Sequence, residues 1–326
     1  MDLNLGGRSI ALDSSSRNAN TFFVSHAHSD HTSGVHKGKE ILASEETIEL
    51  LKARKSIELK RQAPPNGFEL IDSGHILGSK QLYINSDDLG YSIVYTGDYQ
   101  LQKTCVAQGI EIKHADIALI DSTYPYLKVR FDEREEVEEA IRVFANRKLE
   151  QGIVLFGAYS LGKAQEIIKI LNKDNILPVV DKNISAINTV YKKFGIELEY
   201  ASVYEDENLF KEVTRGNFAG IVSMNNLNDL KIALAGMHNK RIFTAVATGF
   251  AKISKFNTDV QFPLSDHADI YQAAEYIERS GAKHVYAYGS GASEMVNNLN
   301  KMGYDAKVFG EMRLLQVEEE LASKNK

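Results

Sequence analysis

The seven residues ending at His31 hold four side chains that commonly bind metal ions. They read Ser-His-Ala-His-Ser-Asp-His and follow residues 21–24, an apolar run that predicts a β-strand. His26 and His28 are two residues apart, so both can face one point and chelate one ion. Asp30 and His31 lie just beyond them and can reach a second ion. Imidazole and carboxylate groups together suit zinc or a similar divalent metal. The alternative is a solvated polar loop that contains histidines by chance.

Two later positions are candidates for the same site. His75 lies in a glycine-flanked turn between two strand-like runs, residues 68–71 and 81–84. Asp98 follows another strand-like run and Gly97, and glycine permits a close backbone approach. A carboxylate at such a strand end is well positioned to bridge two ions. Taken alone, each residue could instead be an ordinary turn residue, which is the more common role of a lone histidine in such a turn.

A third region combines a strand with a candidate phosphate site. The buried-type strand 152–156 leads into Gly-Ala-Tyr-Ser-Leu-Gly-Lys-Ala-Gln, residues 157–165. Backbone N–H groups at a helix start and the Ser160 hydroxyl can donate to a phosphate, and Lys163 adds positive charge. The spacing is not that of a Walker A loop. On these residues alone, an ordinary strand-to-helix turn with a surface lysine is the preferred interpretation.

Together these motifs resemble those of a known family. The His-x-His-x-Asp-His arrangement resembles the metallo-β-lactamase superfamily of hydrolases. The tetrad Asp-Ser-Thr-Tyr that begins at Asp121 resembles motif A of the β-CASP nucleases, especially its form in Artemis-like DNA repair nucleases. Residues 157–165 resemble the phosphate-contact segment of that group, and His267 matches its motif B. The resemblance covers essentially the whole chain.

The resemblance implies a role for each candidate residue. The implied metal ligands are His26, His28 and His75 for a first ion, Asp30 and His31 for a second, and Asp98 as the bridge. The implied catalytic residues are Asp30, Asp121 and His267, of which the last two would pair to protonate the leaving oxygen. Ser160 and Lys163 would hold a substrate phosphate. One or two divalent ions are expected, with zinc as the first choice and manganese or magnesium as alternatives.

Two positions leave the interpretation open. Asp13 follows the strand-like run 9–12. The resemblance implies that it supports a ligating histidine, whereas the serines after it favour a simple turn. Tyr288 stands where RNA-processing members carry a histidine that completes the second metal's ligands, and where Artemis-like members have an aliphatic residue. Tyrosine matches neither class, so the second site is expected to be weak or transiently occupied, and DNA is favoured over RNA.

The order of expected elements predicts the fold class. Helix-like and strand-like runs alternate between residues 164 and 246, which predicts α/β structure with parallel strands. The resemblance implies an αββα metallo-β-lactamase sandwich formed by residues 1–124 and 246–326. It also implies an inserted α/β β-CASP cap, residues 125–245. Such a cap would form a cleft over the metal site, and a cleft suits a polymer substrate.

Composition limits the remaining possibilities. The 326 residues are 43% hydrophobic, so the chain can bury a substantial core. The net charge of −6 excludes a global basic field, so affinity for nucleic acid must come from a local groove and metal ions. The single cysteine, Cys105, cannot form an intrachain disulfide. Without a leader-like N-terminus or a long apolar run, we expect a soluble, cytoplasmic protein with no membrane partner. Residues 318–326 are polar and are expected to fray.

The function expected from these observations is a metal-dependent nuclease that hydrolyses phosphodiester bonds of nucleic acid. Within that class a DNA exonuclease with a repair role is favoured. Three alternatives stay open. They are an RNA-processing β-CASP ribonuclease of the messenger 3′-end type, a small-ester or thioester hydrolase on the same catalytic fold, and a catalytically silent homologue that binds nucleic acid. The motif A, phosphate-contact and motif B segments argue against the second alternative, and the nearly complete ligand set argues against the third.

Overall fold

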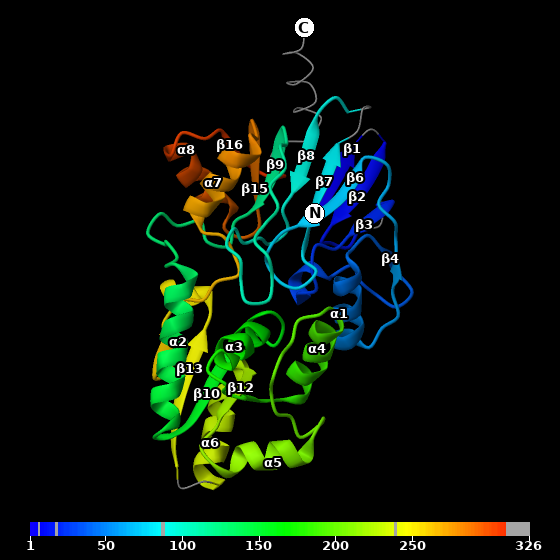
Figure 1. Cartoon of the computed structure of the whole chain (residues 1–326). Coiled ribbons are helices and arrows are strands. Elements are labelled where there is room, and N and C mark those ends of the chain that lie inside the picture. Colours follow the sequence, from blue (N-terminus) through cyan, green and yellow to red (C-terminus); the bar gives the residue numbers. More distant parts are fainter. Residues whose placement is uncertain (6, 17–18, 86–88, 238–239, 311–326) are drawn as a thin grey trace.

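The computed structural model describes residues 1–310 apart from residues 6, 17–18, 86–88 and 238–239, so the polar stretch 318–326 lies outside the described residues. Figure 1 shows two stacked halves. One half contains the strands from both ends of the chain, and the other contains the middle of the chain. The described part is a mixed α/β structure, in agreement with the predicted fold class. No described helix combines the length and apolarity needed to cross a membrane.

A six-stranded sheet is the centre of the first half. Its strands, in spatial order, are β16 (Ala306–Val308), β15 (His284–Tyr288), β9 (Ile117–Asp121), β8 (Ser92–Tyr95), β7 (Lys80–Asn85) and β6 (Phe68–Asp72). Strands β8, β9, β15 and β16 run parallel to one another. Strand β7 is antiparallel to both of its neighbours, β6 and β8. Every residue of β8 and β9 is buried, because the sheet is covered on both faces.

Different layers cover the two faces of this sheet. A three-stranded sheet, β1 (Asp2–Leu5), β2 (Arg8–Leu12) and β3 (Thr21–Phe23), packs on one face through shared apolar residues that include Ile10 and Leu119. Helices α7 (Ile270–Ser280) and α8 (Ala292–Lys301) pack on the other face through residues that include Ile120 and Leu299. The short pair β4 (Glu40–Ile41) and β5 (Lys60–Arg61) and the helix α1 (Glu45–Lys55) follow the three-stranded sheet along the chain.

The second half is built on a five-stranded, fully parallel sheet. Its spatial order is β11 (Val179–Val180), β12 (Ala219–Ser223), β10 (Gly152–Ala158), β13 (Arg241–Ala247) and β14 (Val260–Phe262). The helices of this half are α2 (Arg134–Leu149), α3 (Lys163–Asn172), α4 (Lys182–Lys193), α5 (Glu207–Arg215) and α6 (Leu227–Met237). The predicted parallel α/β arrangement of this region is therefore confirmed. The last strand, β14, still belongs to this sheet, so the sheet extends past residue 245 to Phe262.

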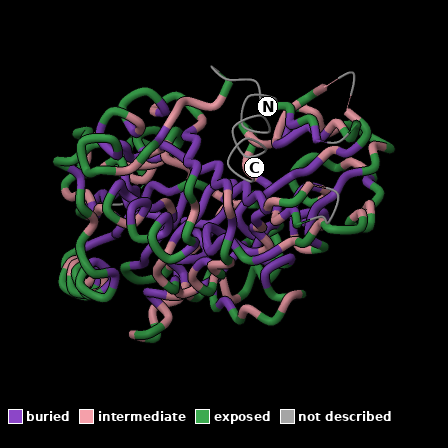
Figure 2. The backbone as a smooth tube through the Cα atoms, turned by 90° about the horizontal axis from the view of Figure 1, so that it is seen from above, coloured by how far each residue is buried: buried purple, intermediate pink, exposed green. Residues whose placement is uncertain are grey.

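The two halves share buried apolar surface. Ile48 and Leu51 of α1 belong to the same buried cluster as Val190 and Tyr191 of α4, and α1 and α4 pack side by side. Figure 2 shows buried residues concentrated in the interior of the molecule and exposed residues on its outer turns. The halves therefore meet through a packed apolar contact, and this contact fixes the position of one half against the other.

Candidate metal centre

The candidate residues line or adjoin one cavity of about 860 Å³ between the two halves. His28 and Asp98 follow strands β3 and β8 of the first half, and Asp121 ends β9. Ser160 follows β10 and His267 follows β14, both strands of the other sheet. Loops at the carboxyl ends of strands are the usual position for ligands in α/β proteins, and here three sheets present those ends to one space.

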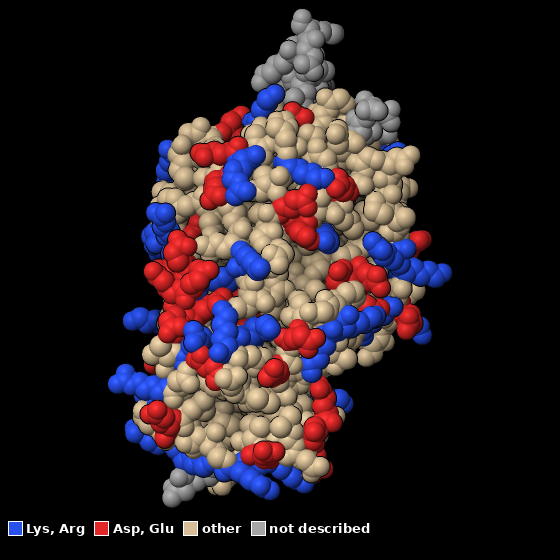
Figure 3. Space-filling view, viewed as in Figure 1, with Lys and Arg blue, Asp and Glu red and all other residues tan. Residues whose placement is uncertain are grey.

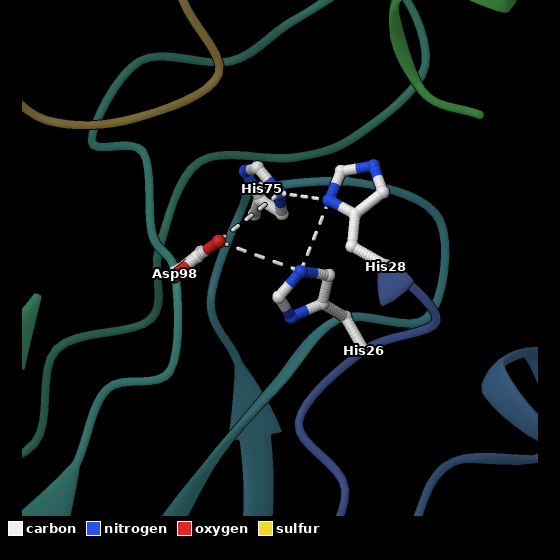
Figure 4. Close-up of side chains that lie close together, drawn as sticks. All are labelled: His26, His28, His75 and Asp98. Carbon is white, nitrogen blue, oxygen red and sulfur yellow. Dashed lines mark hydrogen bonds and ion pairs between the residues drawn. The ribbon is translucent and has the colours of Figure 1, made fainter. Parts of the chain in front are cut away.

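The side chains of three histidines and one aspartate converge on one point (Figure 4), and three of the four, those of His28, His75 and Asp98, line this cavity. His28 Nδ1 lies 3.1 Å from His26 Nε2 and 3.0 Å from His75 Nε2. Asp98 Oδ2 lies 3.4 Å from His26 Nε2 and 3.7 Å from His75 Nε2. The four side chains come from three separate loops, which the predicted strands bring together.

The hydrogen bonds around His26 determine which ring nitrogen faces inward. Ser25 Oγ donates to Asp13 Oδ2 at 2.6 Å, so this hydroxyl accepts from His26 Nδ1, which lies 2.9 Å away. His26 Nε2 therefore carries no proton and directs a lone pair toward Asp98 and the other imidazoles. A carboxylate that orients a ligating histidine in this way is typical of metal sites.

The same reasoning applies to His28 and His75. His28 Nε2 lies 3.2 Å from the Leu161 carbonyl oxygen and donates to it, so its Nδ1 is the inward lone pair. His75 Nδ1 lies 2.8 Å from the Asp266 carbonyl oxygen and donates to it, so its Nε2 faces inward. Three bare nitrogens and a carboxylate oxygen within a few ångströms repel one another, and a cation removes that repulsion. These four residues fit a divalent metal ion.

Burial and charge favour the protonation states that a metal requires. Burial lowers the pKa of His26 and His28 and lowers the pKa of His75 to about 3, so all three are neutral imidazoles at neutral pH. Burial raises the pKa of Asp98, but the charges of His31 and His267 outweigh burial and hold that pKa well below its usual range. Neutral histidines with an ionised aspartate suit zinc and related ions.

His31 and Asp30 lie beside this centre on the outer side. His31 Nε2 lies 3.2 Å from Asp98 Oδ2 and 3.7 Å from Asp30 Oδ2, and the Asp30 side chain is 79% exposed. Burial lowers the pKa of His31, but the carboxylates of Asp98 and Asp13 outweigh burial and raise it to about 12. Their assignment to a second ion stays a prediction.

Asp13 has both of the roles that the sequence left open, as a turn residue and as a residue that supports a ligating histidine. Its φ of 48° places it in a left-handed turn conformation. Its Oδ2 also accepts hydrogen bonds from Ser25 Oγ at 2.6 Å, from His31 Nδ1 at 2.8 Å and from Tyr95 Oη at 2.9 Å. Asp13 therefore orients His31 directly and His26 through Ser25.

A second cluster adjoins the first and shares Asp98. His267 Nδ1 lies 3.0 Å from Asp121 Oδ2, and His267 Nε2 lies 3.9 Å from Asp98 Oδ2. Asp121 Oδ1 accepts from the backbone N–H and the hydroxyl of Thr123 at 3.1 and 2.8 Å, which fixes the carboxylate. Burial lowers the pKa of His267, but Asp98 and Asp121 outweigh burial and raise it to about 9. Spatial proximity of Asp121 and His267, which are 146 residues apart in sequence, is what the resemblance implied.

Tyr288 lines the same cavity at the end of β15. Its ring lies 4.8 Å from the ring of Tyr95, and its hydroxyl lies 3.5 Å from Thr96 Oγ1. Burial raises the pKa of the Tyr288 phenol well above its ordinary value, so the phenol is neutral at neutral pH. The position where RNA-processing members carry a histidine therefore holds a packed aromatic ring in this protein.

Lys163 lines the cavity and is paired with carboxylates, and its contact with a substrate phosphate stays a prediction. Lys163 is 3% exposed, and its Nζ lies 2.8 Å from Glu166 Oε2 and 2.5 Å from Asp266 Oδ1. Two carboxylates neutralise its charge. Ser160 also lines the cavity, and a phosphate contact there stays a prediction.

Sequence reasoning missed the ion-pair network around Lys163. Arg134 of α2 pairs with Glu166 of α3, and its guanidinium also lies 3.5 Å from Asp266 Oδ1 and 3.8 Å from Glu138 Oε1. The only signal in the sequence was that three polar residues, Lys163, Gln165 and Glu166, stand at the start of α3. The structure shows that all three are buried. This network ties α2 and α3 to the loop that carries His267.

No family model matches the chain, but curated relatives do. A probable DNA ligase of Opitutus terrae is 30% identical over 307 residues, which are 90% of this chain and 29% of that protein. An RNase J-like protein of Methanocaldococcus jannaschii is 30% identical over 186 residues, 46% of this chain and 42% of that protein. An uncharacterized protein in the lig 3′ region of Acidianus ambivalens is 32% identical over 130 residues, 39% of this chain and 89% of that protein.

These relatives, together with the converging motif residues, decide the family. The chain belongs to the β-CASP group of the metallo-β-lactamase superfamily. This β-CASP protein spans under a third of the ligase and under half of the RNase J-like protein. Its fold is also similar to a crystal structure of a protein of unknown function from Enterococcus faecalis V583. The TM-score is 0.58 and the identity 15%, over 91% of this chain and 81% of the other.

Proposed function

We propose that this β-CASP protein is a metal-dependent nuclease that hydrolyses phosphodiester bonds. The observation that carries the proposal is the pair of adjacent clusters that share Asp98. One cluster offers three bare imidazole nitrogens to a cation, and the other offers a protonated imidazole held by a carboxylate. A small-ester hydrolase on this fold needs only the first cluster, so the second favours cleavage of a phosphodiester.

We propose the αββα sandwich and the β-CASP cap as the two units of this enzyme. Among the described residues, 1–124 and 263–310 form the sandwich in this assignment, and 125–262 form the cap. The limit moves from 245 to 262 because β14 pairs with β13 in the five-stranded sheet. The layers around the six-stranded sheet, with helices on one face and a second sheet on the other, support the sandwich.

The proposed mechanism divides the chemistry between the two clusters. His26, His28, His75 and Asp98 would hold a divalent ion, and Asp30 with His31 would contribute to a second. A bound divalent ion supplies a low-pKa water and a charge that stabilises the phosphoryl oxygens. The chain's own contribution is His267, which is protonated at neutral pH and can deliver its proton from Nε2 to the leaving oxygen. Asp121 orients this imidazole through Nδ1 and keeps it charged.

We propose DNA as the substrate and an exonuclease with a repair role as the activity. The relative that matches 90% of this chain is named as a probable DNA ligase, and a further relative is named for its position in a lig 3′ region. The neutral, packed Tyr288 also agrees with a site that lacks the extra histidine of RNA-processing members. The name of the RNase J-like relative, which covers 46% of this chain, favours RNA and keeps that substrate as the second candidate.

One experiment tests both parts of this proposal. Metal-stripped protein is incubated with matched single-stranded DNA and RNA, each labelled at the 5′ or the 3′ end, with zinc, manganese or magnesium added. We expect metal-dependent degradation of DNA in preference to RNA, with the order of label release giving the polarity. Preferential RNA cleavage would support the ribonuclease instead. The variant His28→Ala should lose metal-dependent cleavage while keeping the fold, as measured by circular dichroism.

The outcome that contradicts the nuclease is equally clear. If the wild-type protein cleaves neither polymer with any of the three metals, the small-ester hydrolase or the silent homologue replaces the nuclease. Metal content per chain distinguishes the silent homologue, because a protein that binds no ion cannot use this chemistry. Full cleavage by His28→Ala would contradict the ligand assignment.

A further inference from the structure

The mouth of the metal-centre cavity is lined by large apolar side chains that are open to solvent. Twelve large apolar side chains are exposed in the described residues, and four of them line this cavity. The four are Tyr126, Tyr159, Phe250 and Ile253, with exposed fractions of 38, 47, 36 and 37%. We call these four residues the mouth cluster. Exposed aromatic surface concentrated at one cavity is typical of a binding site.

The three aromatic residues of the mouth cluster each follow the end of a strand. Tyr159 follows β10 and Phe250 follows β13, and these two strands are neighbours with Gly157 opposite Val246. Tyr126 follows β9 of the other sheet. The aromatic side chains therefore reach the cavity from both halves of the molecule.

A chain of rings connects the mouth cluster to the proposed proton donor. The ring of Phe250 lies 5.4 Å from the ring of the buried Tyr124, and that ring lies 5.9 Å from the ring of His267. Phe250 is thus one aromatic ring away from the residue that would protonate the leaving oxygen. A base stacked at the mouth would belong to a nucleotide close to the cleaved bond.

The cavity offers few free positive charges to a polymer. Arg54 and Lys163 are the only arginine or lysine residues among those described as lining it. Arg54 donates to the Ala27 carbonyl and, at 3.0 Å, to Ser29 Oγ, while two carboxylates neutralise Lys163. The lining also contains five aspartates, Asp13, Asp30, Asp98, Asp121 and Asp266. Figure 3 shows basic and acidic residues interspersed over one face of the molecule, so that face offers no continuous basic track either.

We propose that Tyr126, Tyr159 and Phe250 form a stacking platform for the unpaired bases of a single strand whose phosphate lies at the metal centre. This inference rests on the proposed nuclease function and adds how its substrate is held. Phosphates away from the metal find few cations here, whereas each base has a flat apolar face that an aromatic ring can stack on. A duplex hides those faces in its own stack, so single strands are preferred. Ile253 extends the apolar wall.

The test measures binding without cleavage. A fluorescent twelve-nucleotide single strand, an abasic strand of the same length and the matching duplex are titrated into metal-stripped protein and followed by anisotropy. We expect the base-bearing single strand to bind tightest. Tyr159→Ala and Phe250→Ala should each weaken its binding roughly 5- to 100-fold and leave abasic binding unchanged. Tyr159→Phe should restore most of the affinity, because the ring remains.

A matched control is available on the same half of the protein. Tyr204 is 63% exposed but does not line the cavity, so Tyr204→Ala should bind like the wild type. Affinity should also fall only shallowly with salt, because few phosphates are neutralised. Equal binding of abasic and base-bearing strands, or wild-type binding by both alanine variants, would overturn the platform.

This test can fail independently of the nuclease proposal. A wild-type protein that cleaves nucleic acid but shows none of these differences removes only the stacking platform. A protein that shows them without cleaving under any metal keeps the platform and removes the nuclease.

Discussion

At the scale of single residues, the pairing of Asp121 with His267 is the feature with the clearest measurable signature. The carboxylate favours the charged imidazole, so removing its charge must lower the pKa of His267. In metal-free protein we expect His267 to titrate near pH 9 in the wild type and closer to 6.5 in Asp121→Asn. The measurement is the pH dependence of the His267 ring signals by NMR.

The asparagine keeps the size of the side chain and its contacts to Thr123, so the fold should be unchanged. The control is His284, a buried histidine of β15, whose ring signals should be the same in the two proteins. An unchanged pKa of His267 in Asp121→Asn would remove Asp121 from its proposed role.

Sequence alone indicated which residues carry chemistry but not what each one touches. His26 and His28 were predictable because two histidines two residues apart after a strand can face a common point, whereas His75 and Asp98 were expected from the family resemblance. Lys163 was not predictable, because one of its partners, Asp266, lies 103 residues away and reaches it only in the folded chain. From sequence alone a lysine is expected to be an exposed cation. In the folded chain Lys163 is buried beside two carboxylates instead.

At the scale of elements, the end of β8 depends on a glycine. Gly97 has a φ of +57°, and a Cβ added there would lie 2.6 Å from Ser25 Cβ. Gly97→Ala should therefore cost about 1–2 kcal/mol for the left-handed backbone and about 1–3 kcal/mol for the overlap. The measurement is the free energy of unfolding from urea titration.

Gly195 provides the matched comparison for this substitution. It has a φ of +80° after the C-terminus of α4, and no atom lies within 4 Å of an added Cβ. Gly195→Ala should therefore lose only the backbone contribution of about 1–2 kcal/mol. Equal losses in the two variants would mean that the contact with Ser25 does not constrain β8.

The elements themselves were predictable where their patterns are long. Helices α1 and α7 each begin after a residue whose side chain caps the helix, Ser44 or Asp269, and a capping residue can be recognised in a sequence. Helix α5 was missed because it buries none of its residues, and β14 and β16 because strands of three residues leave little pattern. The position of a short strand is determined by the strand that it pairs with. That partner lies elsewhere in the sequence, so the local pattern does not reveal the pairing.

At the scale of the whole molecule, the buried ions around Lys163 connect the halves. Lys163→Met removes one cation and leaves Asp266 and Glu166 with only Arg134 nearby. Breaking a buried ion pair in this way typically costs about 3–5 kcal/mol. We expect a loss of that order in the free energy of unfolding.

Lys211 is the comparison for this variant, because it is also a helical lysine with a carboxylate partner, Glu207, but its side chain is 63% exposed. Lys211→Met should change the free energy of unfolding little, because exposed pairs contribute little. A Lys163→Met protein as stable as Lys211→Met would show that the buried network is not what secures α3 to the loop before His267.

Two of the three imidazoles at the metal centre are aligned by carbonyl oxygens that depend on the junction between the halves. His28 donates to Leu161, just before α3, and His75 donates to Asp266, which Lys163 of α3 holds. Docking of the halves and affinity for the ion are therefore thermodynamically coupled. By thermodynamic reciprocity, if docking of the halves favours ion binding by a given factor, ion binding favours docking by that same factor.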